Sequence, residues 1–146
     1  MESMAHRRRC FEIACRKAGL KLTPQRLGIY RELLTARDHP TAEALHRRLR
    51  TTLPTLSLDT VYRTLATLTH HGLISRLETK ESLARFEAVV EPHHHLICCQ
   101  CGKIMDFQWP AMEEISLPDE IRTWGRVDQK SVVLHGICQA CLSESI

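Results

Sequence analysis

The chain has 146 residues, of which 43% are hydrophobic and 25% are charged, an ordinary composition for a globular protein with one domain or two small ones. No apolar run approaches the roughly 18 residues of a transmembrane helix, which excludes an integral membrane protein on this criterion. The basic start, residues 1–9, is followed by no apolar signal core, so we expect a cytoplasmic protein without a membrane partner.

The net charge of +3 combines two halves of opposite sign. Residues 1–89 hold 16 Lys and Arg against 9 acidic residues, a net charge of +7, whereas residues 90–146 hold 4 against 8, a net charge of −4. A basic half suits a polyanion such as nucleic acid. We therefore predict two domains, residues 1–89 and residues 90–146, of which only the first meets a polyanion.

Capping residues and apolar spacing predict four helices in the basic half. The first covers residues 7–18 and ends at Gly19, and the next three begin after the N-caps Thr23, Thr41 and Ser57. The expected buried stripe of the second helix comprises Leu27, Tyr30, Leu33 and Leu34, with Ile29 at its edge, and that of the third comprises Ala42, Leu45 and Leu49.

The fourth helix has an inward apolar face and outer faces that carry other residues. The inward residues are Val61, Leu65 and Leu68, and the outer ones include Tyr62, Arg63 and Thr64. Residues 73–78 and 84–90 then predict two strands joined by a polar turn at residues 79–82. Short helices followed by a hairpin form a winged-helix pattern, a variant of the helix-turn-helix.

The acidic half predicts a small α+β domain. Strands are expected at residues 94–97, 104–107 and 131–136, with a helix over residues 113–124 that is broken at Pro118. A domain of only about 55 residues has difficulty burying a sufficient core. We therefore expect a zinc ion and a partner subunit to help stabilise it.

Two CxxC pairs, Cys98 to Cys101 and Cys138 to Cys141, are separated by 36 residues. Two separated pairs are a strong signal for a four-thiolate tetrahedral zinc site. A reducing compartment also favours metal over disulfides. The remaining cysteines, without an assigned role, are Cys10, Cys15 and Cys99.

Residues 91–106 combine three histidines, three cysteines and an aspartate, the densest group of metal-capable side chains in the chain. On a strand, His93 and His95 point to one face, and His94 points to the other, where we expect it to be exposed. Nitrogen and oxygen donors beside a sulfur site predict a second, exchangeable metal.

The order of these motifs resembles the ferric uptake regulator family of metal-dependent repressors over almost the whole chain. The motifs that carry the resemblance are Leu22-Thr-Pro-Gln-Arg26, His39-Pro-Thr-Ala42, Asp59-Thr-Val-Tyr-Arg-Thr-Leu65, Gly72-Leu-Ile74, Arg85-Phe-Glu87, His93-His-His-Leu-Ile-Cys98, Cys101-Gly-Lys-Ile-Met-Asp-Phe107 and Gly136-Ile-Cys-Gln-Ala-Cys141.

The resemblance implies a homodimer with an N-terminal winged-helix DNA-binding domain and a C-terminal dimerisation domain, acting on double-stranded operator DNA. It implies structural Zn(II) at the four paired cysteines, Cys98, Cys101, Cys138 and Cys141. It implies regulatory metal ligands at His39, Glu87, His93, His95 and Asp106. The expected DNA contacts are Lys21, Thr60, Tyr62 and Arg63.

Three imidazoles and two carboxylates suit Fe(II) or Mn(II) better than a closed zinc cage. Within the family, peroxide sensors tend to carry aspartate where this chain has Asp106, and the resemblance makes His39 and His93 the residues open to oxidation. Glu87, in contrast, is more typical of the iron sensors. The sequence favours a peroxide-sensing repressor, with iron-responsive and zinc-responsive repressors as alternatives.

Two other classes of protein compete with a repressor. A zinc hydrolase is disfavoured, since the chain has no HExxH motif, no nucleophile–base pair and no catalytic residue that we can name. A zinc-stabilised interaction adaptor, whose histidines are only structural, remains an alternative. It predicts DNA affinity that does not depend on Fe(II) or Mn(II).

Overall fold

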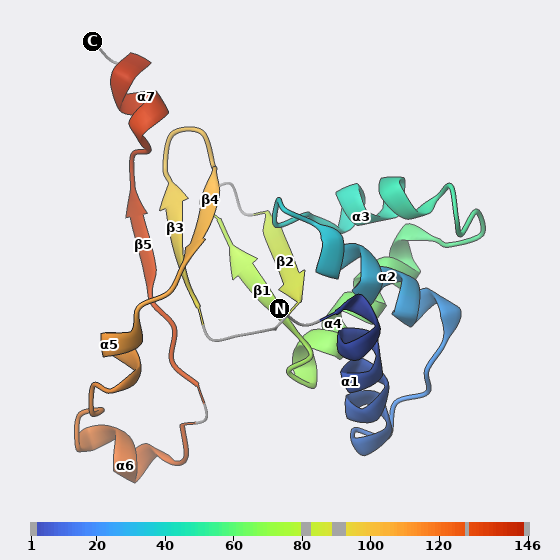
Figure 1. Cartoon of the computed structure of the whole chain (residues 1–146), viewed down its shortest axis with the longest axis horizontal. Coiled ribbons are helices and arrows are strands. Elements are labelled where there is room, and N and C mark those ends of the chain that lie inside the picture. Colours follow the sequence, from blue (N-terminus) through green and yellow to red (C-terminus); the bar gives the residue numbers. More distant parts are fainter. Residues whose placement is uncertain (1–2, 80–82, 89–92, 128, 145–146) are drawn as a thin grey trace. The chain divides into compact units, whose positions relative to one another are not determined.

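A computed structural model gives the fold of the chain (Figure 1) and describes residues 3–79, 83–88, 93–127 and 129–144. The chain forms two compact units, Met1–Val90 and Glu91–Ile146, which we call the N-terminal unit and the C-terminal unit. Within the described ranges, no helix has both the length and the apolar character needed to cross a membrane.

The N-terminal unit contains four helices and a hairpin, as the winged-helix pattern predicts (Figure 1). The elements are α1 (Met4–Lys17), α2 (Pro24–Thr35), α3 (Ala42–Leu49), α4 (Leu58–His70), β1 (Ile74–Glu78) and β2 (Ala84–Ala88). The two strands pair antiparallel, with Ile74 opposite Ala88 and Glu78 opposite Ala84. Most of the polar turn, residues 80–82, and the predicted end of the second strand, residues 89–90, lie outside the described residues.

All three predicted N-caps are confirmed. The side-chain oxygens of Thr23, Thr41 and Ser57 accept hydrogen bonds of 3.1–3.2 Å from the backbone amides three residues further on. Each such cap stabilises its helix by about 1 kcal/mol. Helix α1 starts one turn earlier than predicted, because the Ser3 hydroxyl accepts from the amide of His6 and caps it.

The core of the N-terminal unit is centred on α2, which packs against α3, α4 and β2. On α1, the Phe11 ring stacks on Tyr30 with centroids 3.9 Å apart. Because α2 is covered on several sides, Ile29 is fully buried, so its predicted place at the edge of the stripe is wrong. Thr64 is also buried, because it lies three residues after Val61 and so falls on the inward face of α4.

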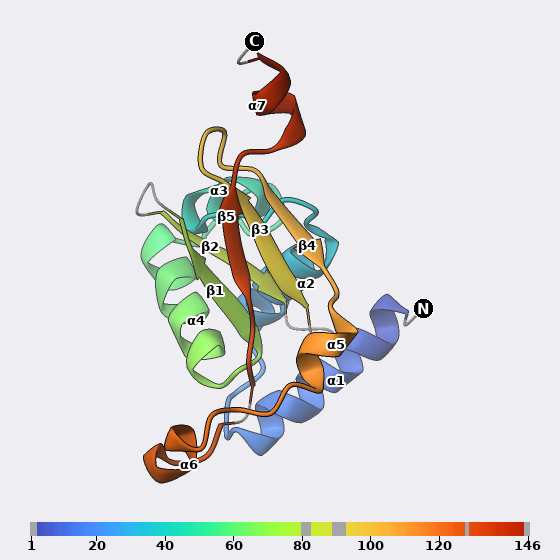
Figure 2. The same cartoon turned by 90° about the vertical axis from the view of Figure 1, so that its left-hand side faces the viewer.

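The C-terminal unit is a three-stranded sheet with short helices. Its elements are β3 (His94–Cys98), β4 (Ile104–Phe107), α5 (Pro110–Glu113), α6 (Glu120–Trp124), β5 (Val133–Gly136) and α7 (Gln139–Glu144). The strand order is β4-β3-β5, with β3 antiparallel to β4 and parallel to β5 (Figure 2). The three strands were expected. The predicted helix over residues 113–124, broken at Pro118, is helical only in its second part, as α6, while α5 ends at Glu113 and, like α7, was not predicted.

The C-terminal unit buries little apolar surface of its own. Among its described residues, the only buried hydrophobic side chains are Ile97, Cys98 and Cys141. Many large apolar side chains are instead exposed, and every residue of β5 is exposed. These exposed residues are Met105, Trp109, Ile115, Leu117, Trp124, Val127, Val133, Leu134, Ile137 and Leu142. A core this small needs further cross-links or a partner surface to be stable.

Candidate metal centres and DNA-facing helix

The parallel pairing of β3 and β5 brings the two CxxC pairs together. Cys98 lies opposite Gly136 in this register, two residues before Cys138, and the amide of Cys99 donates to the Gly136 carbonyl at 2.7 Å. In the first pair the chain turns at Gly102, which has φ +78° and donates its amide to the Cys98 carbonyl. A positive φ of this size favours glycine.

The four cysteine sulfurs lie within 4.8 Å of one another. The Cys98 and Cys141 sulfurs are 3.9 Å apart, and those of Cys101 and Cys138 are 3.8 Å apart. Four thiolates around a tetrahedral zinc, with Zn–S bonds of about 2.3 Å, are separated by about 3.8 Å. The donor type, the number of donors and their spacing therefore fit structural zinc.

Hydrogen bonds from backbone amides favour the thiolate form of one cysteine in this cluster. The amides of Cys101 and Cys138 donate to the Cys98 sulfur at 3.5 and 3.3 Å, and these bonds lower the pKa of that thiol to about 6. Hydrogen bonding to Cys138 and then burial raise the pKa of Cys141 to about 12. Four adjacent thiols cannot all ionise without a positive charge among them, so the cluster requires a metal to become a thiolate cage.

The N-terminal unit places a histidine against a carboxylate. The Nε2 atom of His39 lies 2.9 Å from Oε2 of Glu87, and both side chains are largely buried. The loop that carries His39 is held on β2, because Arg85 donates to the His39 carbonyl and the Phe86 amide donates to the Pro40 carbonyl. We call His39 and Glu87 the N-terminal half-site.

The C-terminal unit contains a second group of the same chemistry. His95 and Asp106 are direct cross-strand partners on β3 and β4, and Nε2 of His95 lies 3.4 Å from Oδ1 of Asp106. The ring of His93 lies 4.8 Å from the ring of His95, as expected for residues on one face. We call His93, His95 and Asp106 the C-terminal half-site.

The prediction that His94 is exposed is wrong. Its ring is fully buried against Phe107 and Trp109, because residues after β4 cover the second face of the sheet. The Val132 amide donates to Nδ1 at 2.9 Å, and Nε2 lies 3.4 Å from the Glu113 carboxylate without the geometry of a hydrogen bond. His94 is thus a core residue of the C-terminal unit, between the two histidines of the half-site.

The outer face of α4 carries most of the predicted DNA contacts. Tyr62 is 46% exposed, and its hydroxyl donates to the Glu43 carboxylate on α3. Arg63 is exposed and pairs with Asp59 one turn earlier. The backbone amide of Thr60 donates to the capping hydroxyl, so this residue also helps to begin the helix.

Lys21 is exposed in the segment between α1 and α2, away from the α4 motif in sequence. A hollow of about 380 Å³ lies beside Tyr62, between α4 and the hairpin, and is also lined by His70 and Arg76. Sequence patterns gave no indication of Glu43 as a partner of Tyr62, because the two residues are 19 positions apart on different helices.

Comparison with known proteins agrees with this arrangement. The model of the ferric uptake regulator family matches residues 17–141. The chain belongs to the ferric uptake regulator family. It is 34% identical to the peroxide-responsive repressor PerR of Staphylococcus aureus over 141 residues, which covers 97% of this chain and 95% of that protein.

Solved structures of the ferric uptake regulator family share the fold. The Helicobacter pylori ferric uptake regulator, described as having three functional metal-binding sites, is 27% identical, with a TM-score of 0.75 over 97% of this chain and 95% of its own. The Pseudomonas aeruginosa ferric uptake regulator with manganese is 30% identical, with a TM-score of 0.73 over 88% of this chain and 97% of its own.

Family membership establishes the general function. The chain is a metal-responsive, DNA-binding transcriptional repressor, and members of the ferric uptake regulator family act as dimers. It is not an enzyme, which excludes the zinc hydrolase. A regulator of this family also replaces the interaction adaptor as the class of the protein.

Proposed function

We propose that this repressor senses hydrogen peroxide through one Fe(II) or Mn(II) ion that takes ligands from both half-sites. The observation that carries the proposal is that each unit presents imidazole nitrogen beside carboxylate oxygen, at 2.9 Å in the N-terminal half-site and 3.4 Å in the C-terminal half-site. The ligands would be His39, Glu87, His93, His95 and Asp106.

The donor set supports Fe(II) or Mn(II) over a sulfur-loving metal. Imidazole and carboxylate together suit these two ions, whereas thiolates select zinc. The four cysteines already form a separate cluster that suits zinc. Zinc would therefore bind the sulfur donors, and Fe(II) or Mn(II) the nitrogen and oxygen donors. The Pseudomonas aeruginosa ferric uptake regulator was solved with manganese, which supports Mn(II) as one of the two candidate ions.

Ligands drawn from both units would hold the two units at one angle. In a dimer, that angle also sets the distance between the two α4 helices, one from each subunit. This distance must match two operator sequences about 34–36 Å apart on DNA. A shift from 1:99 to 99:1 between open and closed forms requires about 5.5 kcal/mol of differential affinity. Five ligands shared between the units are a reasonable source of that difference, because only the closed form offers them all.

The N-terminal unit would meet the operator and the C-terminal unit would join two copies of the chain. Tyr62 and Arg63 on α4 suit base and phosphate contacts, Thr60 orients the start of that helix, and Lys21 suits a phosphate or the minor groove. These DNA contacts are proposed from the exposed position of α4 and from the family motif.

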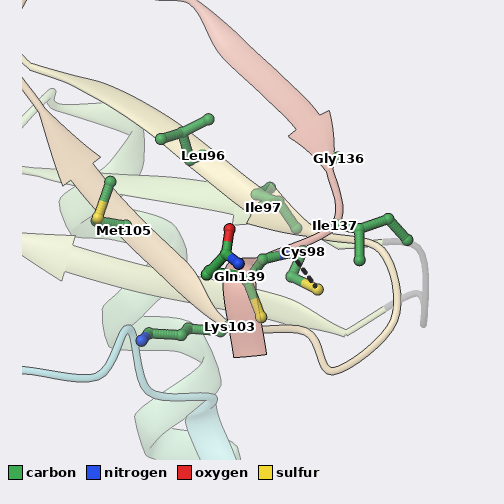
Figure 3. Close-up of a pocket in the computed structure, with 9 residues that line it drawn as sticks. Leu96, Ile97, Cys98, Lys103, Met105, Gly136, Ile137 and Gln139 are labelled. Carbon is green, nitrogen blue, oxygen red and sulfur yellow. Dashed lines mark hydrogen bonds between the residues drawn. The ribbon is translucent and has the colours of Figure 1, made fainter. Parts of the chain in front are cut away.

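Apolar surface in the C-terminal unit supports dimerisation there. A hollow of about 390 Å³ next to the zinc cysteines is lined by Leu96, Ile97, Met105 and Ile137 (Figure 3). Together with the exposed face of β5, this surface is of the kind that a second copy of the chain would cover. Structural Zn(II) at the four cysteines would stabilise the same unit.

Peroxide sensing rests on Asp106 and on the likeness to the Staphylococcus aureus peroxide-responsive repressor. A short carboxylate favours binding through one oxygen, which leaves a coordination position open. When bound there, Fe(II) would activate hydrogen peroxide beside the ligand histidines, and the imidazole that is oxidised would supply the two electrons that reduce the peroxide to water. The chain's own His39 and His93 would then take up oxygen, lose their ligand character and release the DNA.

The second candidate is iron sensing, and Glu87 is the observation that favours it. Its longer carboxylate is the residue that iron sensors of this family tend to carry, and it lies directly against His39. Zinc sensing is a third candidate, disfavoured by the carboxylates of the N/O set. Under both alternatives the histidines are not oxidised when the repressor is released.

Mass spectrometry of Fe(II)-loaded protein after brief exposure to hydrogen peroxide tests the proposal, with Mn(II)-loaded protein as the control. Insertion of one oxygen into an imidazole C–H bond, with release of water, is expected on His39 or His93 only in the Fe(II) sample. DNA binding measured in parallel should require Fe(II) or Mn(II) and should weaken steeply with salt. Release of DNA by peroxide without oxidised histidine would contradict this mechanism.

A further inference from the structure

Two exposed side chains on α4 that suit DNA contact are each held by a carboxylate in the DNA-free protein. Tyr62 donates its hydroxyl to Glu43 on α3, and Arg63 pairs with Asp59 on α4 itself. The Arg63 pair is local, with an i,i+4 spacing, and both members are more than two-thirds exposed. The Tyr62 pair is different, because it joins two helices and fixes a carboxylate next to the DNA-facing ring.

Glu43 lies in the first turn of α3 and is partly buried. Hydrogen bonding from Tyr62, from its own backbone amide and from the Thr41 hydroxyl, together with the charge of Arg47, keeps the pKa of Glu43 below its usual range. The same contact raises the pKa of Tyr62, whose hydroxyl therefore stays a donor. At neutral pH the pair is a phenol bound to a charged carboxylate.

This negative charge stands out against its surroundings. Residues 1–89 carry a net charge of +7, and α3 continues after Glu43 with His46, Arg47 and Arg48. A carboxylate on such a surface repels DNA phosphates. It therefore weakens binding to any duplex that offers it no hydrogen-bond donor. Repulsion of wrong partners is one of the two ways in which an interface gains specificity.

We propose that Glu43 is a specificity-determining residue of the DNA-reading surface, which holds the Tyr62 hydroxyl and accepts a hydrogen bond from a cytosine amino group in the major groove. The inference rests on the proposed function, in which α4 faces operator DNA. A carboxylate has about four acceptor positions, so the bonds from Tyr62, from the Glu43 backbone amide and from the Thr41 hydroxyl leave one for a base. Acceptance from the N4 amino group of cytosine is the usual base contact of a carboxylate.

The pairing also orients Tyr62. A phenol that donates its hydrogen bond to Glu43 keeps its oxygen lone pairs available as acceptors for DNA, so that the two side chains form one recognition unit. Loss of the carboxylate would leave the Tyr62 hydroxyl free to donate to any phosphate. Glu43 thus favours one base pair and disfavours contact with the backbone, and both effects raise the ratio of specific to non-specific affinity.

The test uses the full-length, Mn(II)-loaded protein and a duplex enriched from a random pool by the wild type, with a scrambled duplex as the competitor. Glu43→Gln keeps the size and an acceptor for Tyr62 but removes the charge. Glu32→Gln on α2 makes the same change of charge elsewhere in the unit and is the matched control. For Glu43→Gln we expect the selected-to-scrambled affinity ratio to fall about tenfold, chiefly through tighter binding of scrambled DNA. The control should keep the wild-type ratio.

Two further measurements separate specificity from a purely structural role. Selection repeated with Glu43→Gln should lose the preference for cytosine at one position of each half-site. Tyr62→Phe and the double variant should give non-additive changes in the ratio, because the residues act as a unit. Equal weakening on both duplexes, an unchanged ratio, or the same ratio change in Glu32→Gln would overturn the inference while leaving the repressor function intact. A wild-type protein that enriches no duplex with Mn(II) would overturn the proposed function as well.

Discussion

Replacing one ligand of the cysteine cluster should separate the C-terminal unit from its zinc and from its partner. Cys101 is the most informative position, because its side chain is exposed and a serine there leaves no cavity in the core. Cys98 and Cys141 are buried, so their replacement would change packing as well as metal binding. The effect of Cys101→Ser should therefore arise mainly from the missing thiolate.

The expected magnitude follows from the number of ligands. Structural zinc binds with an apparent free energy of about 10–16 kcal/mol, so each of four thiolates accounts for about 2.5–4 kcal/mol and its loss for a decrease of about 10²–10³-fold in affinity. The C-terminal unit buries only three hydrophobic side chains among its described residues and has little else to replace this energy. We expect zinc and the dimer to be lost together.

Zinc content after gel filtration in a mild chelator, combined with sedimentation velocity, measures both quantities on one sample. Cys99→Ser is the matched control, because Cys99 is exposed in the same turn and lies outside the sulfur cluster. The control should keep zinc and remain a dimer. A Cys101→Ser protein that retains one zinc per chain and dimerises normally would refute the reasoning, as would equal losses in the two variants.

Three further predictions concern the regulatory metal and the N-terminal unit. Asp106→Glu should preserve metal-dependent DNA binding but slow histidine oxidation, because a longer carboxylate can close the open position; unchanged oxidation by mass spectrometry would remove the reason for preferring a peroxide sensor. Ser57→Ala removes the acceptor for the Thr60 amide and should destabilise the N-terminal unit by about 1 kcal/mol in urea unfolding, with an unchanged midpoint as the contrary result. Hydrogen bonding from Arg48 lowers the pKa of Asp38, so their pair stabilises the fold above the ordinary carboxyl pKa and the benefit is lost as pH falls through the lowered value. Asp38→Asn should therefore cost at most about 1 kcal/mol at neutral pH, since both groups are partly exposed, and nothing in strong acid, as followed by unfolding at a series of pH values.

Local signals predicted the helices of the N-terminal unit well. A capping hydroxyl acts on an amide three residues away, so Thr23, Thr41 and Ser57 mark helix starts without knowledge of the rest of the fold. Short elements were harder to predict. Helix α7 has only six residues, too few for a periodic pattern, and two cysteines of the sulfur cluster, Cys138 and Cys141, lie at its start.

Longer-range features were predicted only where chemistry required them. Four cysteines in two CxxC pairs imply a shared cluster. The parallel pairing of β3 with β5 that brings the two pairs together, however, could not be predicted from the spacing of the cysteines. For His94, alternation correctly gave the face of the strand, but it contains no information on what covers that face. The cover comes from Trp109 and neighbouring residues that fold back over the sheet. The hydrogen bond between Glu43 and Tyr62 could not be predicted either, because it depends on how α3 and α4 pack.

The attachment of the His39 loop to β2 has a mechanical consequence. The Arg85 guanidinium and the Phe86 amide both bind this loop, and they immediately precede Glu87 on the same strand. A displacement of either His39 or Glu87 is therefore passed to the β1–β2 hairpin, because no flexible linker separates them from β2. A cation bound to His39 and Glu87 would act directly on the β1–β2 hairpin, so the hairpin is the part of the N-terminal unit that should respond first when the ion leaves.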